Sequence, residues 1–84
     1  MKNISEQISA TLPHELLDAR KRAGLSQKAV AKSIGKTLRQ YQRYERGEII
    51  PPIDVAYMLA DALQTPLSTL TGIEDFPPYN EVEK

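Results

Sequence analysis

The stretch that decides the fold is Leu25–Gly47, which reads LSQKAVAKSIGKTLRQYQRYERG. Ser26 is a good N-cap, because its hydroxyl can accept a hydrogen bond from a free backbone N–H of a first helical turn. Gly35 can end that helix, since glycine adopts the left-handed conformation at a helix C-terminus at little cost. Thr37 can then cap a second helix. Two short helices joined by a glycine-containing turn form a helix-turn-helix.

The second helix of this pair, expected over residues 38–46, has two chemically different faces. At about 100° per residue, Tyr41 and Tyr44 fall on one side with Gln40 at its edge. The opposite side carries Leu38, Arg39, Gln42, Arg43 and Arg46. In a DNA major groove, arginine can pair with guanine, glutamine with adenine, and an apolar side chain can contact a thymine methyl. The helix therefore suits a major groove, although an ordinary solvated amphipathic helix would show the same pattern.

Residues 16–72 resemble the Cro/cI-type (XRE) helix-turn-helix family of bacterial and phage regulators. The matching residues occur in order and without gaps: Arg20, Gly24-Leu25-Ser26-Gln27, Ala31, Ile34-Gly35, Tyr44-Glu45-Arg46-Gly47, Pro51, Leu59-Ala60-Asp61-Ala62-Leu63, Leu67 and Leu70. Each short motif is weak alone, whereas the ordered set is specific. The resemblance implies an all-α, five-helix lambda-repressor-like DNA-binding domain whose second and third helices form the helix-turn-helix.

The resemblance also implies roles for individual residues. In the family, an arginine on the first helix pairs with a glutamate near the end of the recognition helix, which here implies a structural ion pair between Arg20 and Glu45. The residues that would read base edges are Leu38, Arg39, Gln42 and Arg43, with Gln40 at the margin. The residues that would contact the DNA backbone are Ser26, Gln27, Lys36, Thr37 and Arg46. The resemblance implies that Gln27 also braces the recognition helix.

The loop after the recognition helix departs from the family pattern. Many relatives carry Lys or Arg there for a phosphate, whereas this chain has Glu48 followed by Ile49 and Ile50. We therefore expect weaker nonspecific affinity for DNA. The two isoleucines either pack under the loop or serve a protein interface.

Charge is segregated along the chain, although the full sequence has eleven basic and eleven acidic residues and a net charge of zero. Residues 13–47 hold nine Lys or Arg against three acids, and residues 48–84 hold seven acids against one Lys. Phosphate binding depends on a local basic face more than on total charge. The basic half therefore favours a nucleic-acid partner, although a solvated surface can also segregate its charges.

Eighty-four residues make one small domain. We expect an N-terminal arm over residues 1–11, the helix-turn-helix domain over 12–72 and an acidic tail over 73–84. The N-terminal segment is either a frayed arm or a short extra helix. The first helix should begin near residues 11–13, since proline is tolerated in a first turn.

The later helices and the core follow from apolar spacing and from the prolines. A fourth helix is expected over residues 52–64, and a short last helix between Pro66 and Gly72. The buried stripe of the first helix should be Leu12, Leu16, Ala19 and Ala23. The shared core should comprise Leu16, Val30, Ile34, Tyr41, Tyr44, Leu59, Leu63 and Leu70.

Several function classes are disfavoured. The chain has no cysteine, which removes a disulfide framework and a thiolate zinc site. His14 is the only histidine and has no partner for a metal site. Neither a glycine-rich phosphate loop nor a convincing pair of catalytic carboxylates is present, so we expect no enzyme activity and no cofactor. No apolar run approaches the ~20 residues that span a bilayer, and we expect a cytoplasmic protein.

The favoured function is sequence-specific binding of double-stranded DNA by a transcriptional regulator, expected to be a repressor. It would act as a homodimer on a palindromic operator. Two alternatives stay open. One is an antitoxin whose acidic C-terminal half covers a basic toxin, and the other is an adaptor that no longer binds DNA.

Overall fold

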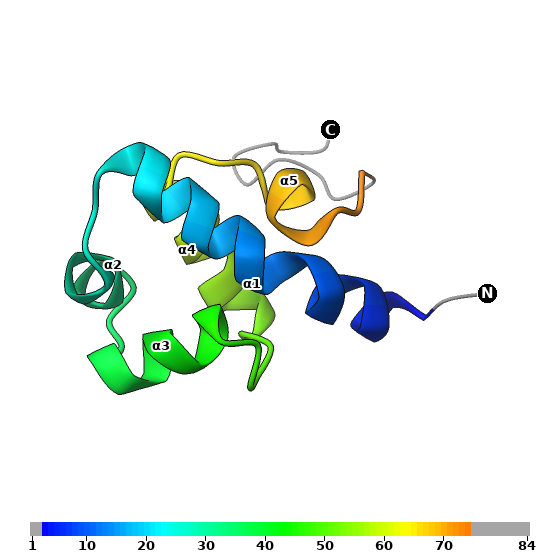
Figure 1. Ribbon diagram of the computed structural model, residues 1–84, viewed down its shortest axis with the longest axis horizontal. Helices are drawn as coiled ribbons and strands as arrows, with labels where there is room; N and C mark the ends of the chain where they lie inside the picture. The colour runs from blue at the N-terminus through cyan, green and yellow to red at the C-terminus, as the bar shows by residue number, and fades with distance from the viewer. Residues whose placement is uncertain (1–2, 75–84) are drawn as a thin grey trace.

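The computed structural model describes residues 3–74, and these residues form five α-helices and no strand (Figure 1). The helices are α1 (Ile4–Ala23), α2 (Gln27–Ser33), α3 (Leu38–Glu45), α4 (Ile53–Ala62) and α5 (Leu67–Thr71). The long helix α1 packs against α3 and α5, while α4 packs against α2 and α5. The expected all-α, five-helix fold is therefore confirmed.

The first helix begins earlier than the sequence indicated. The expected start near residues 11–13 is wrong, because α1 begins at Ile4 and carries Pro13 in its interior. Asn3 caps this helix by accepting a hydrogen bond from the Glu6 amide at 2.8 Å. Asparagine followed three residues later by glutamate is a typical helix start. The sequence therefore contains a signal for the observed start of α1. The described part of the expected N-terminal arm is therefore helical.

Pro13 lies where α1 passes over the end of α3. Proline in a helix interior removes one backbone hydrogen bond, so such a position needs a compensating contact. The Pro13 ring lies against Gly47, where an added Cβ would approach the proline Cγ to 3.1 Å. Gly47 also has a φ of +76°, which glycine adopts readily. Two residues that usually interrupt helices thus form one tight contact between α1 and the turn after α3.

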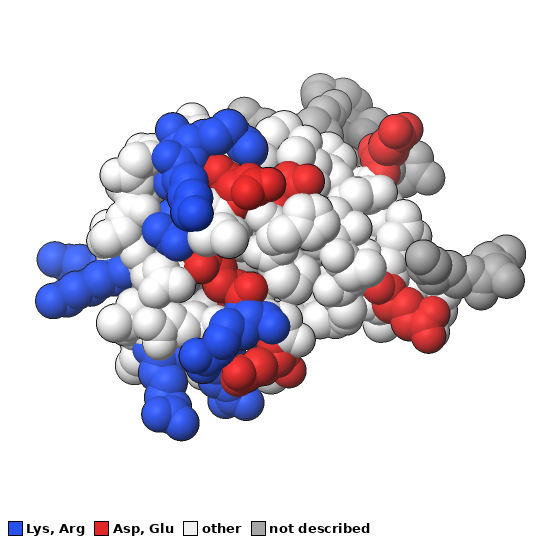
Figure 2. Space-filling model, viewed as in Figure 1, with Lys and Arg blue, Asp and Glu red and all other residues white. Residues whose placement is uncertain are grey.

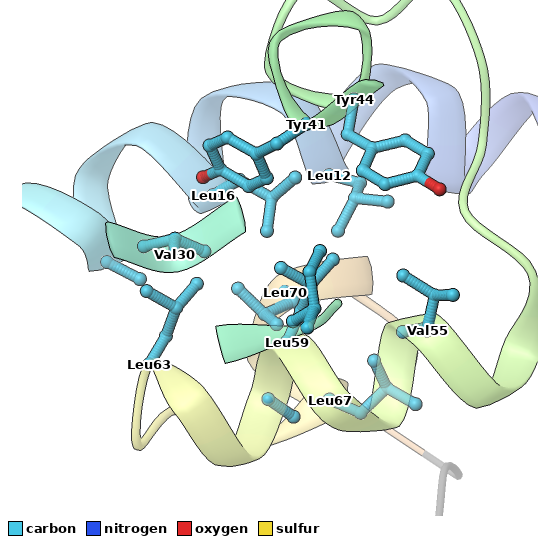
Figure 3. Close-up of a cluster of buried hydrophobic side chains, with 14 of the residues drawn as sticks. Leu12, Leu16, Val30, Tyr41, Tyr44, Val55, Leu59, Leu63, Leu67 and Leu70 are labelled. Carbon is cyan, nitrogen blue, oxygen red and sulfur yellow. The ribbon is translucent and has the colours of Figure 1, made fainter. Parts of the chain in front are cut away.

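The core lies between α1 and α3 on one side and α4 and α5 on the other (Figure 3). Tyr41 and Tyr44 of α3 are fully buried, and their rings meet edge to face with centroids 6.5 Å apart. All eight residues expected in the shared core are buried. Ala23 is exposed instead of buried, because it is the last residue of α1 and the chain turns away at Gly24.

The remaining helix boundaries lie close to the expected ones. Helix α4 begins one residue later than expected and ends two residues earlier, and α5 is flanked by Pro66 and Gly72 as expected. Most of the predicted tail, residues 73–84, lies outside the described residues. No helix in the described part of the chain combines the length and the apolar character needed to cross a membrane.

Candidate nucleic-acid interface

Helices α2 and α3 are built from local capping signals and pack directly against each other. The Ser26 hydroxyl accepts from the Ala29 amide at 3.0 Å, and the Thr37 hydroxyl accepts from the Gln40 amide at 3.1 Å. Between the two helices, Gly35 takes a left-handed φ of +70°. Each cap satisfies a backbone N–H that has no partner within its helix. The caps therefore define the residue at which each helix begins.

Helix α3 presents the face that the sequence predicted. Tyr41 and Tyr44 point into the core, and this fixes the rotation of the helix about its axis. Leu38 keeps 40% of its surface exposed, although it is a large apolar residue. Arg39 beside it is exposed as well. An exposed leucine next to an arginine at the start of a helix can contact base edges, since an apolar side chain can meet a thymine methyl and arginine can pair with guanine.

A carboxylate near the end of α3 joins three helices. Glu45 accepts from Arg20 Nε at 2.5 Å and Nη2 at 3.3 Å, from the Tyr41 hydroxyl at 2.6 Å, and from Gln27 Nε2 at 2.9 Å. The Arg20 Nη1 group also donates to the Leu25 carbonyl at 3.0 Å. The Arg20 and Glu45 side chains are only 14% and 7% exposed. Arg20 and Glu45 thus form a bidentate pair that ties α1 to α3, and Gln27 adds α2.

Burial and hydrogen bonding shift the pKa values of this cluster. Burial by itself would raise the pKa of Glu45, but hydrogen bonds from Arg20, Tyr41 and Gln27 hold it below its ordinary value. The hydrogen bond to Glu45 raises the pKa of Arg20. Burial, together with the neighbouring carboxylate, raises the pKa of Tyr41. The cluster is therefore an ionised pair with a neutral tyrosine at neutral pH.

Two glutamines link the expected reading helix to the helix before it. Gln42 Nε2 donates to Gln27 Oε1 at 3.1 Å, and Gln27 in turn donates to Glu45. Gln42 was expected to read bases and Gln27 to contact the backbone, and the structure brings the two side chains together. One amide hydrogen and the carbonyl oxygen of Gln42 stay available, since an amide offers two donors and two acceptor lone pairs.

Two of the expected DNA-contacting arginines share one acidic partner. Arg43 Nε lies 3.4 Å from Glu48 Oε1, and Arg46 Nε lies 3.0 Å from Glu48 Oε2. All three side chains are between 43% and 58% exposed. Sequence reasoning treated Glu48 only as a missing basic residue. The signal for this pairing was the position of Glu48 in the sequence, two residues after Arg46 and five after Arg43.

The basic side chains gather on one half of the molecule. On the face seen in Figure 2, Lys and Arg gather over the half that holds α2, α3 and the end of α1. Within residues 3–74, every Lys and Arg lies between positions 20 and 46. Ser26, Lys36, Thr37 and Arg46 are exposed, and Gln27 and Gln40 are partly exposed. The residues expected to contact DNA therefore lie on α2, on α3 or in the adjoining turns, within the basic half.

Other kinds of site have little support among the described residues. No group of three or more His, Cys, Asp or Glu side chains is placed to hold a metal ion within residues 3–74. A hollow of about 180 Å³ between α1, α4 and α5 is lined by apolar side chains and the hydroxyl-bearing Thr71. The Thr71 hydroxyl donates to the Leu67 carbonyl at 2.8 Å, so it is already engaged.

Comparisons with known proteins agree with the geometry. A family model described as helix-turn-helix (HTH_3) matches residues 16–70. The solved structure of an HTH_3 family transcriptional regulator from Vibrio cholerae is similar, with 28% sequence identity and a TM-score of 0.68. That match covers 81% of this chain and 38% of the other chain. No curated protein sequence matches at a significant level.

Proposed function

The chain belongs to the helix-turn-helix (HTH_3) family, and from this premise we propose that it binds double-stranded DNA sequence-specifically as a transcriptional regulator. One observation carries the proposal. Helix α3 buries both of its tyrosines and turns Leu38 and Arg39 outward on the basic half of the molecule. A helix that is anchored by its apolar face and basic on its outer face can enter a major groove.

The proposed contacts divide into two groups. The residues that read base edges are Leu38, Arg39, Gln40, Gln42 and Arg43. The residues that hold the DNA backbone are Ser26, Gln27, Lys36, Thr37 and Arg46. Arg20 and Glu45 stay within the protein, where they hold α3 against α1.

The protein acts as a homodimeric repressor in this proposal. Two copies related by a two-fold axis place their α3 helices about 34 Å apart, one turn of DNA, and so read a palindrome. Each copy measures 33 × 31 × 21 Å between its outermost Cα positions along the principal axes. Two copies side by side can therefore reach the required spacing. A dimer bound over a promoter would exclude the polymerase.

The test is selection of binding sites from a randomised DNA library by the purified protein, followed by a salt titration on the enriched sequence. We expect a palindrome, and an affinity that falls steeply with salt because each phosphate contact releases counterions. A matched selection with Arg39→Ala should lose the enrichment. If wild-type protein enriches no sequence and binds weakly even at low salt, the proposal fails.

A second candidate function is an antitoxin- or adaptor-type protein whose main partner is another protein. Ile50 and Ile53 favour it, because these large apolar side chains are 42% and 59% exposed near the acidic residues Glu48 and Asp54. Such a surface suits a partner that is both apolar and basic. The same library selection separates the adaptor from the regulator, since an adaptor enriches no operator. An antitoxin would still bind its own promoter, so it is identified instead by stable complex formation with a basic protein partner.

A further inference from the structure

We propose that Glu48 sets the specificity of DNA binding by competing with DNA for Arg43 and Arg46. In the free protein its carboxylate engages both arginines, and a cognate site outcompetes it more readily than random DNA does. The inference rests on the proposed function, because it concerns how the same face distinguishes one sequence from another.

The backbone holds Glu48 at the end of α3. The Glu48 amide donates to the Arg43 carbonyl at 2.9 Å, and the Gly47 amide donates to the Tyr44 carbonyl at 3.1 Å. These two bonds, with Gly47 in the left-handed region, form a Schellman motif. The Pro13 ring packs on Gly47 and leaves the turn little room to move. The Glu48 side chain therefore starts from a defined point beside both arginines.

The carboxylate uses one oxygen for each arginine. Oε1 lies 3.4 Å from Arg43 Nε, and Oε2 lies 3.0 Å from Arg46 Nε. Arg43 is a proposed base reader and Arg46 a proposed backbone contact, so one acid engages one member of each group. Among residues 3–74, neither arginine has another ion-pair partner.

Helix stability does not explain an acid at this position. The C-terminal end of a helix carries partial negative charge, which repels a carboxylate and attracts a cation. Glu48 lies at that end of α3 and is acceptable there because two arginines surround it. The two ion pairs with the arginines, rather than the helix dipole, therefore explain why an acid is tolerated at this position.

The strength of these pairs suits discrimination. An exposed ion pair changes an equilibrium constant by about fivefold at most. A bidentate contact between arginine and guanine is worth about 5- to 150-fold against a wrong base. A correct base can therefore draw Arg43 away from Glu48 at small cost. Random DNA offers mainly phosphates, and there the competition and the repulsion by the carboxylate take away a larger share of the affinity.

The experiment compares wild-type protein with Glu48→Gln and with Asp61→Asn. Asp61→Asn is the control because it changes the net charge equally at an exposed α4 residue with no ion pair in the described chain. Fluorescence anisotropy gives the affinity for the enriched operator and for a random duplex over a range of salt. Arginine Nε–Hε NMR signals, recorded without DNA, report the pairing directly.

For Glu48→Gln we expect affinity for random DNA to rise about three- to tenfold and affinity for the operator to rise less, so the specificity ratio falls. The plot of log affinity against log salt should steepen by about one, since a further phosphate contact forms. The Arg43 and Arg46 Nε–Hε signals should shift in Glu48→Gln and stay in place in Asp61→Asn.

Two results would overturn the inference and differ in what they mean. If wild-type protein binds the operator and Glu48→Gln behaves like Asp61→Asn, or raises both affinities equally, Glu48 has no part in specificity while the proposed function stands. If wild-type protein binds no DNA at any salt concentration, the proposed function fails and this inference fails with it.

Discussion

At the scale of single residues, Glu45 accepts more side-chain hydrogen bonds from other helices than any other residue within 3–74. Its two oxygens take hydrogen bonds from side chains of α1, α2 and α3. The carboxylate is 7% exposed, so water cannot replace a lost partner. The same residue that fixes the position of α3 therefore also holds three helices of the domain together.

Glu45→Ala should lower the free energy of unfolding by about 3–5 kcal/mol, because it leaves the Arg20 guanidinium buried without its counter-charge. Urea denaturation measures the loss. Glu48→Ala is the control, since its exposed ion pairs are worth about 1 kcal/mol or less. A double replacement of Arg20 and Glu45 by leucine should recover part of the stability. Equal losses in Glu45→Ala and Glu48→Ala would contradict a buried, structural pair.

Gly47→Ala should also destabilise the domain, and by more than Gly24→Ala does. Both glycines have a φ above +70°, where an alanine costs about 1–2 kcal/mol. A Cβ at Gly24 meets no atom within 4 Å, whereas one at Gly47 meets Pro13 Cγ at 3.1 Å. Thermal unfolding of the two variants isolates the cost of this contact. Equal melting temperatures would show that the Pro13 ring gives way freely.

At the scale of elements, the two faces of α3 differ, since one packs into the core and the other faces outward. Its tyrosines anchor it in the core, and its outer residues include the proposed DNA contacts. The N-terminal turn of α3 is the least engaged part of that outer face. Arg39 is exposed and forms no ion pair among residues 3–74, whereas Gln42 and Arg43 already bind protein groups.

Arg39→Ala and Lys36→Ala should therefore weaken DNA binding in different ways. Arg39→Ala should cost about 1–3 kcal/mol on the cognate site and little on random DNA, as expected for a base reader. Lys36→Ala should weaken binding to all sequences alike and reduce the salt slope by about one, as expected for a phosphate contact. Binding titrations on both duplexes measure this. Equal losses on random and cognate DNA would contradict base reading by Arg39.

At the scale of the whole molecule, the described basic residues are confined to one structural part, formed by α2, α3 and the end of α1. On the face seen in Figure 2, the basic residues lie over the helix-turn-helix, and all Lys and Arg of residues 3–74 lie between positions 20 and 46. A zero net charge therefore conceals a strongly polarised molecule. Acid conditions should test how firmly the helices of the basic half are held together, because Glu45 links α1, α2 and α3 there.

The stability of the whole domain should fall in acid, and Glu45 should account for part of the fall. Its pKa in the folded protein is lower than the ordinary value of 4.5. A depressed pKa contributes stability above the unfolded value and loses it as the pH falls through the folded value. Denaturation at pH 7, 5, 4 and 3 should show a smaller decrease for Glu45→Gln than for wild type. Parallel curves would contradict a shifted Glu45.

The sequence by itself determined the elements whose causes are local. The caps at Ser26 and Thr37 and the turn at Gly35 act on neighbouring residues, so the bounds of α2 and α3 could be predicted within one residue. The rotation of α3 followed from its tyrosines, which are three residues apart. The pairing of Arg20 with Glu45 is different, because these residues are 25 positions apart and no local pattern links them. Only the family resemblance implied this pair.

Only the tertiary structure decided the features that need distant partners. Helix α1 continues through Pro13, which packs on Gly47, a residue far along the chain. The hydrogen bond from Gln42 to Gln27, 15 positions apart, depends on how α2 and α3 meet. Local propensity carries no information about such contacts, because each forms only once packing has brought its two distant partners together.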